Sequence, residues 1–273
     1  MTCTAIVVAG GGAAAAFPPG VQKQLHEAGV RPKTLYGTSG GALDVSTHAY
    51  AGPDELIRLW RSIRSWGDVL DFNAGTLTTR SAGKFNSAPL REKIDRVCQG
   101  TPRCEAVVCK VRLSDGAAVY SKSGDADFAE SVQASAAVPY IMEPVNGFID
   151  GGARHVLPLA KAIKDGHEDI IAILCQPWNF QDYLWTDRPG FFRAERIFLR
   201  YLDIALYNAL RDDIVGCLAR NNRPGYRRVK LTVYAPPYPI LDASQLKPEL
   251  VSRAINIGLN ARPIQIPEID EAA

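Results

Sequence analysis

The sequence predicts an α/β protein of three layers, in which a mostly parallel central sheet is covered by helices on both faces. Two observations lead to this fold class. Apolar runs rich in β-branched residues, typical of strands buried on both faces, alternate along the chain with segments of helical periodicity. Three of these runs end in turns that carry glycine. The chain has 273 residues, of which 47% are hydrophobic, so it is long enough to bury such a core.

Five apolar runs are interpreted as the main strands, and a short run at 117–121 is expected to pair beside the third as a hairpin. The five runs are 4–9, 34–36, 106–113, 169–175 and 228–234. A further apolar pair, Phe148 and Ile149, leads into a turn at Asp150.

Helical spacing, prolines near helix starts and glycine stops predict the helices. They are expected at 21–29, 42–50, 54–66, 89–97, 127–138, 158–164, 191–220 and 248–259. Pro18 and Pro19 place the start of the first helix after them, or introduce a kink. The long helix is a candidate for a break near Gly216, and the polar segment 71–88 is expected to be a loop or lid.

The organisation predicted is a single domain over residues 1–273, because no internal repeat or linker interrupts the chain. The motifs that carry chemistry lie within about 3–175, and the C-terminal helices and last strand occupy 189–262.

Composition excludes several classes of protein. The 31 basic and 29 acidic residues balance to a net charge of +2, which gives no support for nucleic-acid binding. No apolar run reaches 18 residues, so no transmembrane helix is expected. The N-terminus lacks the basic start of a signal peptide. The six cysteines show no metal-ligand spacing and are expected to be reduced, buried thiols of a cytoplasmic protein.

The turn from Gly37 to Gly41 has the pattern of a nucleophile elbow, with Ser39 between strand and helix. Such a turn is so sharp that its flanking residues can carry almost no side chain, and Gly37 and Gly41 meet that need. The helix beneath Ser39 would supply free N–H groups, including that of Gly40, where an oxyanion forms.

Two other glycine-bearing turns also follow apolar runs. In α/β sheets, ligands bind beyond the carboxyl ends of parallel strands, so turns at these ends are expected to lie close together. The first turn, with Gly10, Gly11 and Gly12, offers backbone N–H groups. The other, with Asp150, Gly151 and Gly152, offers a carboxylate. A hydroxyl, a carboxylate and oxyanion donors are what acyl transfer requires.

The three turns together resemble the patatin-like phospholipase family, which has a glycine-rich loop, a Gly-x-Ser-x-Gly elbow and an Asp-Gly-Gly or Asp-Gly-Ala turn in this order. The stretch 134–139, ahead of the aspartate turn, is similar to the helix and proline of the family at that place.

The resemblance implies a lipid acyl hydrolase, of phospholipase A or lysophospholipase type, with no metal or organic cofactor. It implies that Ser39 is the nucleophile and that Asp150 is the general base. Oxyanion donors would come from the Gly10–Gly12 loop and Gly40. A lipid ester is the implied partner, with transient contact to a membrane surface left open.

One departure from the family favours an alternative. The loop of the family carries a basic residue and a last glycine where this chain has Ala14 and Ala15. Because losing one oxyanion donor costs about 10²–10³ in rate, a weak enzyme or a non-catalytic module that binds lipid or protein remains an alternative.

Other interpretations are weaker. A dinucleotide loop needs glycine at Ala15 and an acidic end to the second strand. Ser39 could cap a helix, and Asp150 could cap a turn. His155 or His167 could complete a conventional triad. The helix at 54–66 could meet lipid, although packing its apolar face on the domain is favoured.

Overall fold

The central sheet sets the architecture of the protein, for which a computed structural model describes residues 5–72, 82–179, 193–241 and 246–266. Within these ranges seven strands form the sheet, with β10, β9, β1, β2, β5 and β6 in that order and β8 also paired to β5. The strands on the path are β1 (Ala5–Val8), β2 (Thr34–Thr38), β5 (Glu105–Arg112), β6 (Ala118–Lys122), β9 (Asp169–Ile173) and β10 (Lys230–Tyr234).

The sheet is parallel from β10 to β5, and only β6 and β8 (Phe148–Asp150) run antiparallel to β5. Strands β1, β2 and β9 are almost entirely buried, since both faces of the sheet are covered. This arrangement confirms the predicted fold class.

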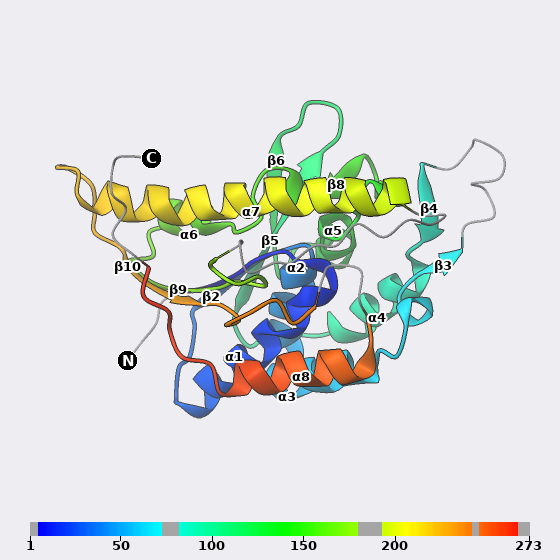
Figure 1. Cartoon of the computed structure of the whole chain (residues 1–273), viewed down its shortest axis with the longest axis horizontal. Coiled ribbons are helices and arrows are strands. Elements are labelled where there is room, and N and C mark those ends of the chain that lie inside the picture. The colour runs from blue at the N-terminus through cyan, green and yellow to red at the C-terminus, as the bar shows by residue number, and fades with distance from the viewer. Residues whose placement is uncertain (1–4, 73–81, 180–192, 242–245, 267–273) are drawn as a thin grey trace.

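Two groups of helices form the outer layers (Figure 1). One face carries α6 (Leu159–Lys164) and α7 (Arg193–Asn221), which contact each other. The other carries α1 (Pro18–Glu27), α2 (Gly40–Ala51), α3 (Pro53–Ser62), α4 (Ala88–Val97) and α8 (Pro248–Leu259). Helix α5 (Phe128–Ser135) packs against β5 and α2.

Several element boundaries differ from the prediction. Helix α1 starts at Pro18, with both prolines in its first turn, where a missing N–H costs no helical hydrogen bond. Helix α7 continues through Gly216 without a break. Helix α3 ends at Ser62, and a 3₁₀ turn follows at Trp66–Asp68.

A small second sheet is present that the sequence did not predict. It consists of β3 (Asp71–Phe72), β4 (Gly83–Asn86) and β7 (Tyr140–Met142). Part of the segment expected to be a loop or lid therefore forms strands, and residues 73–81 of that segment lie outside the described residues.

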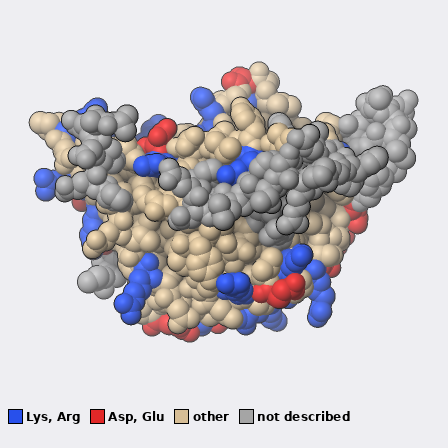
Figure 2. All heavy atoms as spheres, viewed as in Figure 1, with Lys and Arg blue, Asp and Glu red and all other residues tan. Residues whose placement is uncertain are grey.

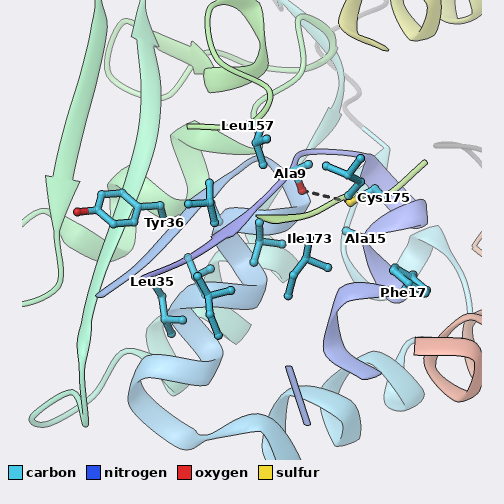
Figure 3. Packing of buried hydrophobic residues seen from close by; sticks show 14 of the residues in the cluster. Ala9, Ala15, Phe17, Leu35, Tyr36, Leu157, Ile173 and Cys175 are labelled. Atoms are coloured by element: carbon cyan, nitrogen blue, oxygen red, sulfur yellow. Dashed lines mark hydrogen bonds between the residues drawn. The ribbon is translucent and has the colours of Figure 1, made fainter. Parts of the chain in front are cut away.

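The core continues beneath the carboxyl edge of the sheet (Figure 3). There Cys175 points toward β1, and its Sγ donates to the carbonyl oxygen of Ala9 over 3.2 Å. A Cβ atom on Gly11 would lie 2.5 Å from the Cβ of Cys175, so only glycine fits at that place in the loop. The glycine loop thus rests directly on the buried side chain of Cys175, just beyond the end of β9.

Candidate active site

The serine turn has the geometry of a nucleophile elbow. Strand β2 ends at Thr38, helix α2 begins at Gly40, and Ser39 between them has φ 56° and ψ −125°. A non-glycine residue at positive φ costs about 1–3 kcal/mol and persists only where its surroundings hold it. A Cβ on Gly37 would lie 2.3 Å from the carbonyl oxygen of Gly41, so the turn closes only because Gly37 has no side chain.

Strand β5 brings Asp150 beside this turn. Thr38 pairs with Cys109 of β5, and Asp150 pairs with the next residue, Lys110. At Lys110 one edge of β5 is paired with β6, so β8 must pair with the other edge. That is the edge to which β2 is bonded, and β8 pairs with it just beyond the last residue of β2. Ser39 and Asp150, far apart in sequence, are therefore neighbours along one strand.

The carboxyl of Asp150 is buried, with 7% of the residue exposed. Its Oδ1 accepts the N–H of Gly152 over 2.7 Å, whereas the buried Oδ2 completes no hydrogen bond among the described residues. Burial raises the pKa of Asp150 to about 6, and the Ser39 hydroxyl and Gly152 N–H act in the opposite direction. The Ser39 hydroxyl is therefore close enough to lower the pKa of Asp150, although Oδ2 completes no hydrogen bond among the described residues. Long or incomplete hydrogen bonds between catalytic groups are common before substrate binds.

The glycine loop lies against the first turn of α2. After Gly10 the chain turns through Gly11 and Gly12, where Gly12 has φ 55°, into a 3₁₀ helix at Gly12–Ala16. A Cβ on Gly40 would lie 3.0 Å from the carbonyl oxygen and 3.6 Å from the nitrogen of Gly12. The start of α2 and the loop therefore meet at the same place.

The backbone N–H groups of these glycines are not equivalent. Gly10 donates its N–H to the carbonyl oxygen of Val156 over 2.9 Å, which removes it from the predicted set of oxyanion donors. The N–H groups of Gly11, Gly12 and Gly40 donate to no backbone carbonyl in the described part of the chain, as is usual for the first turns of helices.

Three further hydrogen bonds hold the turns together. Thr38 Oγ1 donates to the carbonyl oxygen of His155 over 2.8 Å. The backbone N–H of Ser39 donates to Oγ of Ser135 over 3.0 Å, and the N–H of Asp150 donates to the carbonyl oxygen of Ala137 over 3.0 Å. Sequence reasoning assigned no role to Ser135. The only signal was its place in the small-residue run before Pro139.

The histidines proposed as alternative bases lie in other contacts. The ring of His155 lies 6.3 Å from that of Tyr120, and His167 Nε2 lies 3.0 Å from the hydroxyl of Tyr36. Among the described hydrogen bonds, none joins either imidazole to Ser39 or Asp150.

Helix α3 packs on the domain, as favoured. Leu56 and Trp60 are buried, and Trp60 Nε1 donates to the buried carboxyl of Asp44 over 2.7 Å. Arg58 and Arg61 are exposed on the opposite side. The apolar face of this helix is therefore occupied by the protein itself.

Charged side chains and cysteines give no sign of a second type of site in the part of the chain that the structure describes. Basic and acidic side chains both occur on the face shown in Figure 2, and no continuous basic patch is visible between them. The described cysteines form no disulfide, and Cys109, Cys175 and Cys217 are buried. Burial raises the pKa of the Cys109 thiol to about 12. In the described ranges there is no cluster of His, Cys, Asp and Glu suited to a metal ion, and no helix long and apolar enough to cross a membrane.

The three turns therefore lie together at one edge of the sheet. Comparison with known proteins identifies the class of protein. Residues 6–163, more than half of the chain, match the family described as "Patatin-like phospholipase". The chain belongs to the patatin-like phospholipase family.

Among solved structures, VipD from Legionella pneumophila is similar, with 12% sequence identity and a TM-score of 0.47. The match covers 94% of this chain and 65% of that one, so this chain spans less than two thirds of the length of VipD. No curated protein matches the chain.

Proposed function

We propose that this protein is a serine acyl hydrolase that cleaves carboxylic ester bonds of lipids, of phospholipase A or lysophospholipase type, through Ser39 and Asp150. One observation carries the proposal: a serine at positive φ lies beside a buried carboxyl whose pKa is raised to about 6. Because a general base works best with a pKa near the operating pH, this shift suits Asp150 to accept a proton from a hydroxyl.

In the proposed first step Asp150 takes the proton of the Ser39 hydroxyl while Oγ bonds to the ester carbonyl carbon. The carbonyl oxygen becomes an oxyanion that accepts hydrogen bonds from the N–H groups of Gly11, Gly12 and Gly40. The ester C–O bond then breaks, and Asp150 gives its proton to the departing alkoxide. The result is an acyl group on Ser39.

In the second step Asp150 accepts a proton from a water molecule, whose oxygen attacks the acyl carbon. The bond to Ser39 Oγ breaks, the fatty acid leaves, and the proton returns from Asp150 to Ser39. The same three N–H groups hold the second oxyanion. Neither step requires a metal or an organic cofactor.

Helix α7 supports the further proposal of transient contact with a membrane surface. Ile197, Tyr201 and Ile204 are exposed at the spacing of one helix face. Leu206 of the same helix reaches within 3.9 Å of the place where a Cβ on Gly152 would lie. Leu206 lies about half a helical turn away from Ile197. Helix α7 therefore places one side against the aspartate turn and presents the exposed apolar residues on its other side. The cytoplasmic location stays a prediction.

A binding module with weak or no catalysis is the alternative, because Ala14 and Ala15 replace the basic residue and glycine of the family. Both alanines are buried, with Ala14 2% and Ala15 0% exposed. No cation of the loop itself therefore supports an oxyanion at these positions.

The deciding experiment measures hydrolysis of a short-chain chromogenic ester and of a lysophospholipid by wild type, Ser39→Ala and Asp150→Asn. The proposal predicts turnover by wild type and a loss of at least about 10³-fold in both variants. Vesicle binding by wild type without Ser39-dependent turnover would instead support the binding module.

A further inference from the structure

Ser135 occupies a place in the site that the proposed chemistry does not use. It is the last residue of α5, and it is fully buried. Its Oγ accepts the backbone N–H of the nucleophile, Ser39, over 3.0 Å. Two residues further on, the carbonyl oxygen of Ala137 accepts the backbone N–H of Asp150 over 3.0 Å. The turn 135–137 at the end of α5 is therefore bonded to both halves of the dyad.

The N–H of Ser39 needs such an acceptor because the elbow takes it out of the sheet. The ladders of β2 with β1 and with β5 both end before Ser39, whose N–H donates to no backbone carbonyl among the described residues. Ser39 is 8% exposed, and a buried backbone donor without a partner is rare in folded proteins. A single side-chain oxygen, from an element remote in sequence, satisfies it.

The hydrogen bond from Ser39 to Ser135 also means that the N–H of Ser39 is not an oxyanion donor. Since the N–H of Ser39 points at Ser135, it is not available to an oxyanion, in contrast to the N–H of Gly40 in the following position. The donors that remain are those of the glycine loop and the start of α2.

We propose that Ser135 is a positioning residue, which acts with the Ala137 carbonyl to fix Ser39 against Asp150. The inference rests on the proposed function for its effect on rate, but the contact itself is independent of any substrate. Ser39 is held at positive φ by its surroundings, and Ser135 supplies the one hydrogen bond on its N–H. Removing it frees the elbow to rotate its hydroxyl away from the carboxyl.

The test compares Ser135→Ala with Ser46→Ala as matched control. Ser46 is also buried, but its hydroxyl donates only to the carbonyl oxygen of Ala42 in its own helix, over 2.6 Å. We expect kcat for a short-chain ester to fall by about ten- to a hundredfold in Ser135→Ala with KM unchanged, because small misplacement of reacting groups costs this much. Ser46→Ala is expected to keep kcat near that of wild type.

Ser135→Cys provides a second variant of nearly the same shape, in which sulfur is a weaker acceptor than oxygen. Its kcat is expected to lie between those of wild type and Ser135→Ala. It carries the test if the alanine variant does not fold. Equal kcat in wild type and both Ser135 variants, at equal thermal stability to the control, would overturn the role of Ser135.

A second readout separates failure of this inference from failure of the proposed function. Amide hydrogen exchange of Ser39, followed by NMR, reports the hydrogen bond without any substrate. We expect exchange at least about tenfold faster in Ser135→Ala than in Ser46→Ala. Unchanged exchange would overturn the inference even in an active enzyme. Faster exchange in a protein without esterase activity would support the contact and count only against the proposed chemistry.

Discussion

At the scale of single residues, burial is what supports the base role proposed for Asp150. The ionised carboxylate loses hydration, and only the hydrogen bond from Gly152 and the nearby Ser39 hydroxyl offset this loss. The raised pKa has two measurable consequences, one for the pH dependence of the reaction and one for the stability of the fold.

The pH dependence of kcat/KM is expected to show a limb near pH 6, because Asp150 accepts a proton only when ionised and its pKa is raised to about 6. The value should rise about tenfold per pH unit below this point and level off above it. Burial and the neighbouring Asp212 also raise the pKa of Asp213 to about 6, so Asp213→Asn is the control. A limb near pH 4, or one that disappears in Asp213→Asn, would contradict the role of Asp150.

Asp150→Asn is expected to stabilise the protein while it removes activity. A carboxyl whose folded pKa is raised destabilises the fold above that pKa, and this cost vanishes below the pKa of the unfolded chain. The free energy of unfolding of Asp150→Asn is therefore expected to exceed that of wild type by at most about 3 kcal/mol at pH 8, and this difference disappears near pH ~4. Asparagine keeps an oxygen to accept from Gly152. Thermal unfolding at both pH values checks the prediction, and equal stability of the two proteins at pH 8 would contradict it.

At the scale of elements, the strand β5 determines where Ser39 and Asp150 meet. The sequence indicated that Ser39 and Asp150 follow apolar runs, and the convergence of such turns at a sheet edge could be predicted. The pairing of β8 with the edge of β5 beyond the end of β2 could not, because Phe148–Asp150 is too short to show strand direction or register. The three-residue β7 escaped detection for the same reason.

The glycine loop gives a prediction about the missing basic residue. Ala14 is buried beside the loop, so Ala14→Arg would place a guanidinium where the structure has room for a methyl group. We expect it to destabilise the protein by at least about 1–3 kcal/mol and to leave kcat/KM no higher than in wild type. Ala28→Arg, at the exposed C-terminal end of α1, is the matched control. An increase in kcat/KM without loss of stability would show that the loop accepts the residue of the family.

Helices α1 and α8 pack at the closest distance that glycine permits. A Cβ on Gly258 would lie 2.4 Å from the carbonyl oxygen of Phe17, and one on Gly20 would lie 2.1 Å from that of Ile255. Gly258→Ala must separate the two helices, and we expect it to lower the free energy of unfolding by about 1–3 kcal/mol.

The control for this prediction is Gly216→Ala in α7, where a Cβ would meet no described atom within 4 Å beyond the backbone of its own helix. There alanine is expected to raise the free energy of unfolding by about 0.5–1 kcal/mol, because alanine favours the helix. Denaturant unfolding measures both variants. A Gly258→Ala protein as stable as wild type would mean that α1 and α8 are not tightly packed.

At the scale of the whole molecule, the fold class and the three turns could be predicted because glycine, apolar runs and helical periods leave local marks in the sequence. The contacts that join the turns leave no such marks. The bond from Ser39 to Ser135 and the one from Gly10 to Val156 depend on tertiary placement alone.

The C-terminal part of the chain extends the structure beyond the region matched to the family. Helix α8 packs on α1, and β10 continues the sheet beside β9. We therefore propose that residues 1–273 form one domain, in which the matched region does not make up the whole hydrophobic core.

The central claim is that Ser39 is a nucleophile activated in place by Asp150. Reaction with a fluorophosphonate tests it most directly, because the probe forms a covalent bond only with an activated serine. Intact-protein and peptide mass spectrometry should find one adduct, on Ser39, in wild type, and none in Ser39→Ala. Its rate of formation should fall strongly in Asp150→Asn. An unlabelled wild type, or an adduct on another serine, would contradict the account.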